Sequence, residues 1–239
     1  GGRAGGRRGR SRRSSVDRGA GAGGGRAGRL WAEVGLEASA GLVGVGVFKS
    51  VDGGLTWRFL ESTSTDANAD WRFVNRLAIH PSQTQVLLAG VSNLNSAVGG
   101  IYRTADGGAT WARVSTMKAL DIAFDPNTPA NAVAGLDDGT IAYSRDAGLT
   151  WTRSAPLVAS PSGRQNTARA EIAFARSQPG LVYASVDNAK GEVWKSLDAG
   201  ATWAKLATPE HLAGQGDYDN AIWADPLDAN VVVVGGLDL

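Results

Sequence analysis

The chain has 239 residues, of which 43% are hydrophobic and 20% charged, with a formal net charge of +1 and no cysteine. This composition is ordinary for a globular protein, and the lack of cysteine excludes a disulfide framework and thiolate metal sites. Because the sequence has no apolar run of about 18 residues, it predicts no membrane-spanning helix.

The amino-terminal segment, residues 1–38, is rich in glycine and arginine. Its first 29 residues hold nine arginines against a single acid, Asp17. Such a segment has too few apolar side chains to offset the entropy lost on ordering, so we predict that it is disordered and dispensable. Arginine-rich tails can bind nucleic acid through phosphate contacts, but this one lacks the interleaved aromatic residues that stack on bases. No nucleic-acid partner is therefore expected.

One motif recurs four times in the remainder of the chain. The pattern Ser/Thr-x-Asp-x-Gly-x-Thr-Trp, called the Asp motif below, occupies residues 50–57, 104–111, 144–151 and 196–203. Successive copies are 54, 40 and 52 residues apart, which is about the length of one four-stranded sheet in a repeat protein.

The residue types of the Asp motif are those of a tight turn. Glycines allow positive φ, the aspartate and the first hydroxyl accept backbone hydrogen bonds, and the tryptophan supplies apolar area that packs beneath the turn. A structural role is therefore predicted for all eight conspicuous side chains, namely Asp52, Asp106, Asp146, Asp198, Trp57, Trp111, Trp151 and Trp203.

A second pattern, two short apolar strands around a polar turn, alternates with the first at residues 77–90, 122–136, 172–185 and 222–236. A third strand leads into the Asp motif, and a fourth follows it. Each repeat is thus predicted to be an antiparallel sheet of four strands, with the Asp motif between the third and the fourth. Complete units span 72–114, 120–153 and 171–206, and half-units span 46–59 and 220–239.

The Asp motif resembles the Asp box, or BNR repeat, of sialidases, oligoxyloglucan-type glycoside hydrolases, sortilin-like receptors and photosystem II assembly factor-like proteins. The resemblance covers residues from about 41 to 239 and implies an all-β fold, a β-propeller of four-stranded antiparallel blades over residues 39–239. The closing segment is similar to bacterial secreted propellers, which implies an extracellular or cell-envelope location. The two half-units could form one closing sheet, but we expect an incomplete piece of a larger propeller.

The loops opposite the Asp motifs are longer and less uniform, and long loops on a rigid scaffold commonly carry binding residues. Candidate ligand-binding residues there are Asp70, Arg169, Asp217, Tyr218 and Asp219. Aligning the first strands of the repeats places Arg76, Asp121 and Glu171 at one equivalent position. We predict that these three charges converge, either as a belt of ion pairs or as part of a ligand site.

The resemblance covers enzymes and binding proteins alike, so function is judged on the residues. The sialidase amino-terminal Arg-Ile-Pro motif and the Gly-rich catalytic segment of the oligoxyloglucan hydrolases are missing from this sequence. The favoured hypothesis is a non-catalytic secreted propeller that binds a glycan or protein on its loops as a monomer, without metal or cofactor. The alternative is a fragment of a glycoside hydrolase.

Overall fold

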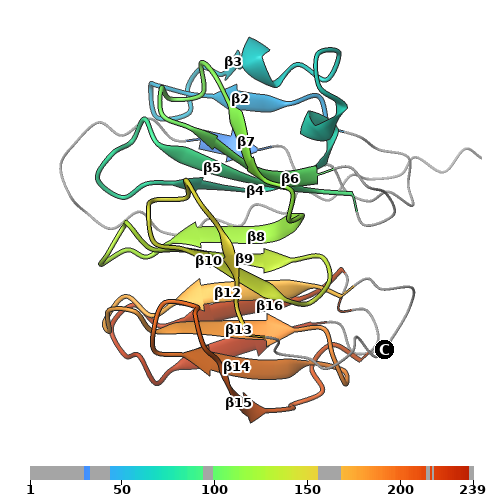
Figure 1. Ribbon diagram of the computed structural model, residues 1–239, viewed down its shortest axis with the longest axis vertical. Helices are drawn as coiled ribbons and strands as arrows, with labels where there is room; N and C mark the ends of the chain where they lie inside the picture. The colour runs from blue at the N-terminus through green and yellow to red at the C-terminus, as the bar shows by residue number, and fades with distance from the viewer. Residues whose placement is uncertain are drawn as a thin grey trace, which may run out of the picture.

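The computed structural model describes residues 30–32, 44–93, 99–155, 168–213, 216 and 218–236, which form five antiparallel β-sheets. Figure 1 shows the first four sheets following one another in chain order along the long axis, with β16 of the last sheet at the level of β12. The predicted all-β architecture of four-stranded antiparallel units is confirmed.

Three sheets have four strands that lie side by side in chain order, within two residues of the expected bounds. Their strands are β4 (Val74–Ile79), β5 (Leu87–Ser92), β6 (Gly99–Thr104) and β7 (Ala112–Ser115); β8 (Ala119–Phe124), β9 (Ala132–Leu136), β10 (Ile141–Ser144) and β11 (Thr152–Arg153); and β12 (Ala170–Phe174), β13 (Val182–Val186), β14 (Glu192–Ser196) and β15 (Ala204–Ala207).

The two flanking sheets are smaller. The first contains β1 (Leu30–Ala32), β2 (Val47–Lys49) and β3 (Arg58–Phe59), and the last contains β16 (Ala221–Ala224) and β17 (Val232–Gly235). The strands β2, β3, β16 and β17 are the two expected half-units. They belong to separate sheets in the described part of the chain, so the half-units do not combine into one closing sheet here.

Strand β1 differs from the sequence-based prediction, because Leu30–Ala32 lies inside the segment 1–38 that we predicted to be disordered. It pairs with β2 through Leu30 opposite Lys49 and Ala32 opposite Val47. One physical reason is that Leu30 and Trp31 are large apolar residues that directly follow the Gly/Arg-rich residues 1–29. The other is that the edge of β2 offers unpaired backbone groups. Residues 1–29 and 33–38 lie outside the described residues, so for them disorder stays a prediction.

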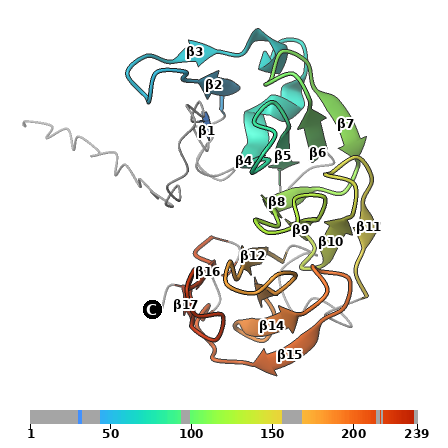
Figure 2. The same ribbon diagram turned by 90° about the vertical axis from the view of Figure 1, so that its left-hand side faces the viewer.

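The antiparallel strand order sorts the connections between two faces. The Asp motifs and the turns between first and second strands lie on one face, called the motif face. The connections between second and third strands and between successive sheets, including the 3-10 helices η1 (Glu61–Thr63) and η2 (Ala69–Phe73), lie on the loop face. Figure 2 shows the sheets as an arc, with β4, β8, β12 and β16 on its inner side and β7, β11 and β15 on its rim.

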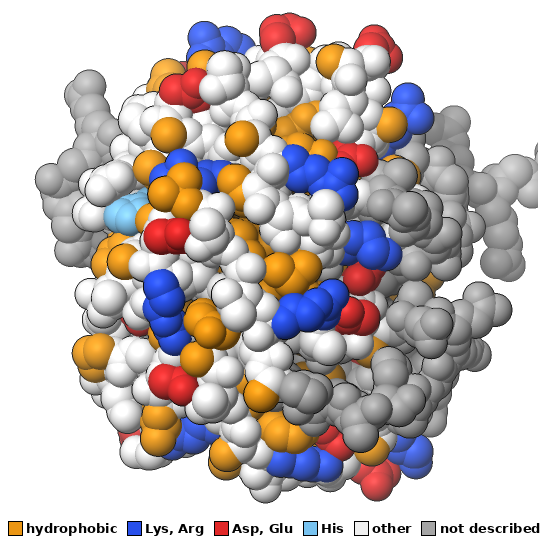
Figure 3. Space-filling view, in the orientation of Figure 1, with side chains coloured by type: hydrophobic (Ala, Val, Ile, Leu, Met, Phe, Trp, Pro, Cys, Tyr) orange, Lys and Arg blue, Asp and Glu red, His pale blue; other side chains and the backbone are white. Residues whose placement is uncertain are grey.

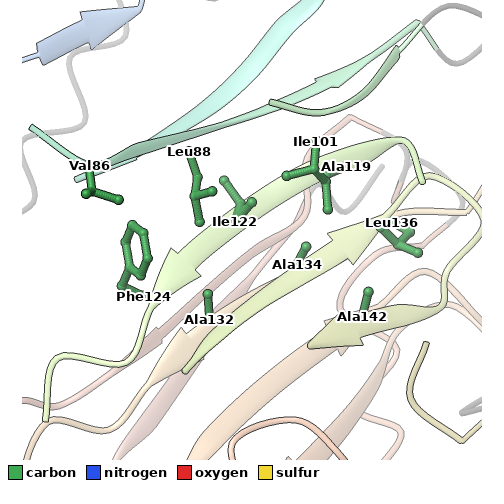
Figure 4. Packing of buried hydrophobic residues seen from close by; sticks show 10 residues of the cluster. All are labelled: Val86, Leu88, Ile101, Ala119, Ile122, Phe124, Ala132, Ala134, Leu136 and Ala142. Atoms are coloured by element: carbon green, nitrogen blue, oxygen red, sulfur yellow. The ribbon is translucent and has the colours of Figure 1, made fainter. Parts of the chain in front are cut away.

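The hydrophobic core lies between neighbouring sheets. The second strands β5, β9 and β13 are buried along their whole length, because a sheet covers each of their faces and their residues are apolar or small throughout. Figure 4 shows the cluster between the second and third sheets, where side chains of the two sheets face one another. Its largest members are Leu88, Ile101, Ile122, Phe124 and Leu136.

Two glycines on second strands let the first strand of the next sheet approach closely. A Cβ atom at Gly90 would lie 3.0 Å from the carbonyl oxygen of Ala119, and one at Gly135 only 1.9 Å from that of Ala170. These glycines lie opposite Arg76 and Asp121 in the strand pairing. The missing side chains therefore bring together the strand positions that carry the predicted charges.

All four Asp motifs form the same hydrogen-bonded turn. In the second motif the backbone N–H of Thr110 donates to Asp106 Oδ1 (2.9 Å) and its hydroxyl to Asp106 Oδ2 (2.6 Å), while Gly108 N–H donates to Thr104 Oγ1 (3.0 Å). Equivalent bonds recur in the other three motifs. Both Gly107 and Gly108 have positive φ, as the turn requires. The aspartates thus hold their own turns together.

The tryptophans of the motifs pack against the preceding sheet. The indoles of Trp111, Trp151 and Trp203 join the apolar clusters at the three junctions between successive sheets, counted from the first to the fourth. The indole of Trp57 differs from the prediction: it is 41% exposed. The reason is that Trp57 belongs to the first sheet, which no other sheet precedes among the described residues.

Candidate functional site

The three charges predicted to converge do meet on the loop-face half of the inner strands. Arg76 on β4 contacts Asp121 on β8 (Nε to Oδ1, 2.6 Å) and Glu171 on β12 (Nη2 to Oε2, 3.2 Å). A second arginine, Arg169, contacts Glu171 from the other side (Nε to Oε1, 2.7 Å). The ion pairs therefore link three successive sheets, and Arg169, a candidate predicted separately, belongs to the same cluster.

Backbone groups fix the position of Asp121. Its Oδ1 accepts from the N–H of Ile122 (2.9 Å) and its Oδ2 from the N–H of Ile172 in the next sheet (2.9 Å). A buried carboxylate needs such partners, because an ion taken out of water without them is strongly destabilising. Asp121 thus joins the third and fourth sheets through backbone as well as through Arg76.

The two buried carboxyl groups differ in acidity. Burial raises the pKa of Glu171 to about 7, and the charge of Asp121 adds to this effect, while Arg169 and Arg76 oppose it. Burial acts on Asp121 in the same direction, but Arg76 and the N–H of Ile172 outweigh it and hold the pKa of Asp121 below its usual value. The charge of Asp121 in turn raises the pKa of Arg76. Near neutral pH, Glu171 is therefore the group of the cluster that can exchange a proton.

A fourth ion pair, between Lys118 and Asp137, was missed from the sequence. Lys118 Nζ, just before β8, lies 2.5 Å from Asp137 Oδ2, just after β9, and the hydroxyl of Ser92 donates to the same oxygen (2.9 Å). Only the folding of β5, β8 and β9 onto one another brings these three residues together, and no sequence spacing signals it.

A polar group around Ser185 was also missed. Ser185 Oγ lies 2.8 Å from His211 Nε2, and Asn220 Nδ2 donates to the carbonyl oxygen of Ser185 (3.1 Å). Burial lowers the pKa of His211. A signal was present: Ser185 occupies the strand position that Gly90 and Gly135 occupy in the preceding sheets, so aligning the second strands would have found it.

Asp70, among the other predicted candidates, has its partner outside the cluster. The carboxylate of Asp70 accepts a hydrogen bond from the hydroxyl of Tyr102 (Oδ2, 2.5 Å) beside the buried Trp71, which is a packing role. The side chains of Tyr218 and Asp219 are exposed in the connection that precedes β16. Asp217 lies outside the described residues.

The surface of the cluster is cationic although its ion pairs are balanced. The side chain of Arg76 is 35% exposed, whereas those of Asp121 and Glu171 are 5% exposed. Guanidinium N–H groups at such a surface can donate to hydroxyl, carbonyl or carboxylate oxygens of a ligand. The carboxylates of Asp121 and Glu171 lie beneath the arginines.

The described residues contain no helix long and apolar enough to cross a membrane. Across the same ranges, His, Asp and Glu side chains nowhere gather in a group of three or more that could hold a metal ion.

Comparison with protein-family models gives no match, and no curated protein matches the chain. Solved structures of similar fold include an ancestral GH74 enzyme (21% identity, TM-score 0.61, covering 80% of this chain and 25% of that one) and the GH74 xyloglucanase from Xanthomonas campestris (18%, 0.61, 81% and 33%). A GH74 enzyme from Niastella koreensis is also similar (21%, 0.57, 80% and 32%).

At these identities the likeness concerns the fold alone. The chain spans about a quarter to a third of the length of these relatives. It is a run of β-propeller blades: three complete four-stranded sheets with a smaller sheet on either side.

Proposed function

We propose that this chain is a non-catalytic β-propeller region that binds a glycan or protein ligand on its loop face, in a secreted or cell-envelope protein. The observation that carries the proposal is the layering of the charged cluster, in which arginines face solvent while both carboxylates lie beneath them. The guanidinium N–H groups can therefore donate hydrogen bonds to a ligand, whereas the carboxyl groups beneath them are not exposed to it.

The resemblance of the Asp motif to the Asp box supports the same proposal, since that repeat occurs in receptors and binding propellers as well as in enzymes. The extracellular or cell-envelope location depends on this resemblance alone. The geometry of the motif is consistent with a non-catalytic role, because each aspartate accepts hydrogen bonds from its own turn.

A glycan array and a peptide array probed with the recombinant chain test the proposal. Once a ligand is found, Arg169→Ala is expected to weaken its binding at least about tenfold, which corresponds to the loss of about 1.4 kcal/mol. The matched control is Arg176→Ala, an exposed arginine on the motif face, which should leave binding unchanged. Thermal unfolding of both variants checks that they are folded. Weaker binding by the Arg176 variant alone would refute the face assignment.

The alternative, a fragment of a glycoside hydrolase, is favoured by one observation, namely that the similar structures include GH74 enzymes. Hydrolysis of a glycosidic bond requires two carboxyl groups that flank the bond, about 5 to 9.5 Å apart. We expect no release of reducing sugar from xyloglucan oligosaccharides by the chain. Release that Glu171→Gln abolishes, with unfolding unchanged, would establish the alternative instead.

A further inference from the structure

The two acids of the charged cluster on the loop face are held in different ways. Asp121 has backbone partners: it accepts from the N–H groups of Ile122 and Ile172, each at 2.9 Å, in addition to its contact with Arg76. These partners belong to the second, third and fourth sheets, which all have four strands. The charge of Asp121 is therefore stabilised by the complete sheets themselves.

Glu171 has side-chain partners only. Its Oε1 lies 2.7 Å from Arg169 Nε and its Oε2 lies 3.2 Å from Arg76 Nη2, and its carboxyl group also forms a hydrogen bond with that of Asp121. Among the described residues, no backbone N–H donates to the Glu171 carboxylate. Of the groups that the structure describes, the two arginines are therefore the ones that stabilise a charge on Glu171.

Most of the other groups around Glu171 are uncharged near neutral pH. Ser185 lies opposite Glu171 on β13, and its hydroxyl contacts the imidazole of His211, whose pKa is lowered by burial. On β16 the equivalent inner position is Ala221. The charged groups of the adjoining elements are the ion pair of Lys118 with Asp137 and the carboxyl group of Asp187, which directly follows β13.

The arginines of the cluster reach solvent, whereas their counter-ions do not. The side chains of Arg76 and Arg169 are 35% and 23% exposed, and that of Glu171 is buried beneath them. In the pair of Arg153 with Asp138, by contrast, both side chains are exposed. Figure 3 shows acidic and basic side chains next to one another at the surface on the rim side of the arc. In the cluster, Glu171 thus neutralises from below two cations whose outer side faces solvent.

The charge of the cluster depends on the proton of Glu171. With Glu171 ionised, two arginines and two carboxylates balance, and with Glu171 protonated the cluster carries one net positive charge. Burial and the charge of Asp121 raise the pKa of Glu171 to about 7, so both states are populated near neutral pH. A guanidinium group has five N–H donors in a planar fork, which pairs well with an oxyanion. Protonation of Glu171 therefore leaves the arginines with more capacity for an anion from solvent.

We propose that Glu171 is an internal counter-ion, and that an oxyanion of the ligand replaces it on Arg76 and Arg169 while Glu171 takes up one proton from solvent. This inference rests on the proposed function and specifies its ligand chemistry and its regulation. The proton resides on the Glu171 carboxyl group, where Asp121 accepts its hydrogen bond, and no bond of the ligand is made or broken. Because ligand and proton bind together, acid strengthens binding and alkali weakens it.

NMR titrations of the recombinant chain with sodium sulfate and with sodium formate test the inference. Both probes keep their charge between about pH 5.5 and pH 8.5, and sodium chloride holds the ionic strength constant. The backbone amide signals of Ile122 and Ile172 report on the cluster, since both N–H groups bind Asp121. The chain with Glu171 protonated falls from nearly all molecules to about one in thirty over this range, so the Kd should rise about thirtyfold. Tighter binding of sulfate or of formate identifies a tetrahedral or a planar oxyanion.

Two matched variants locate the proton. Glu171→Gln cannot ionise, so it should bind the probe at both pH values with the Kd that the unmodified chain has in acid. Glu210→Gln, at an exposed glutamate of the same face, should keep the thirtyfold change. Arg169→Ala should weaken binding of the probe at about pH 5.5 by at least about tenfold. A pH dependence that persists in Glu171→Gln would assign the proton to another group, such as His211, and would overturn the inference.

The failure of this inference is distinguishable from the failure of the proposed function. A glycan or peptide ligand that Arg169→Ala weakens, but whose Kd is the same at both pH values, would leave the loop-face function intact and overturn the proton uptake. Absence of binding of both probes at about pH 5.5, up to about 100 mM, would also overturn the inference. Weaker ligand binding by Arg176→Ala alone, on the motif face, would overturn both.

Discussion

Glu171 is the residue whose environment departs furthest from that of an ordinary carboxylate. It is buried beside Asp121 and held between Arg76 and Arg169, and its pKa is raised to about 7 from a usual value of 4.5. Between these two pH values the folded protein keeps a proton that the unfolded chain releases. The free energy of unfolding that depends on Glu171 therefore falls as the pH rises through this window.

Replacing Glu171 with glutamine should remove this pH dependence. We compare the free energy of unfolding of Glu171→Gln with that of the unmodified chain. The difference, variant minus unmodified, should increase by about 3 kcal/mol from about pH 5 to pH 7.5. Urea unfolding at both pH values measures it, and comparison with the unmodified chain cancels the opposing titration of His80 and His211, whose pKa values are lowered mainly by burial. The control, Glu210→Gln at an exposed glutamate of the same face, should show no change with pH. A constant difference for Glu171→Gln would contradict the raised pKa.

The aspartate of an Asp motif should matter to stability and not to ligand binding. Asp106→Ala removes the acceptor of three hydrogen bonds from Thr110 and Thr104, so we expect the free energy of unfolding to fall by about 1 to 3 kcal/mol. Denaturant unfolding checks the value. Asp66→Ala, at an exposed loop aspartate, is the control and should change it by less than about 0.5 kcal/mol. Loss of ligand binding by a fully folded Asp106 variant would contradict the structural role.

Among the strands, the close approach of β12 to β9 depends on the absence of a side chain at Gly135. A Cβ atom at Gly135 would lie 1.9 Å from the carbonyl oxygen of Ala170, so Gly135→Ala must move β12 away from β9. Overpacking of this kind costs about 1 to 3 kcal/mol, and here it also separates the strands that carry Asp121 and Glu171. Thermal unfolding should show a clear decrease for this variant.

The matched control is at the equivalent position of the last sheet. Gly235 lies opposite Ala221 as Gly135 lies opposite Asp121, but a Cβ atom there meets nothing within 4 Å. Gly235→Ala should therefore leave the unfolding temperature unchanged or raise it slightly. Equal effects of the two substitutions would show that strand propensity, and not the contact between sheets, decides the outcome.

For the whole molecule, a short and a long deletion of the amino-terminal segment are expected to have different effects on stability. Deletion of residues 1–29 should leave the unfolding temperature unchanged, because these residues combine high charge with few apolar side chains. Deletion of 1–38 also removes β1, which pairs with β2. Because the longer deletion removes these backbone pairs, it should lower the unfolding temperature. Equal unfolding temperatures for the two deletions would mean that β1 adds nothing to stability.

The repeat pattern predicted most of the fold, because it encodes local structure. The turn chemistry of the Asp motif and the apolar strands around it are properties of short segments, so strand order and sheet boundaries followed within two residues. The convergence of Arg76, Asp121 and Glu171 also followed, because equivalent positions of successive repeats necessarily lie on adjacent inner strands.

What the sequence by itself determined is therefore the repeating unit: its four strands, its hydrogen-bonded turn and the position that each repeat presents to the next. Only the tertiary structure decided which side chains meet between repeats. Lys118 reaches Asp137 across a contact that no spacing encodes, and His211 reaches Ser185, whose position the repeats mark but whose partner they do not. Trp57 is exposed although its three counterparts pack against a neighbour. Identical motifs differ in burial because burial depends on the preceding sheet, and the motif's own residues carry no information about whether that sheet is present.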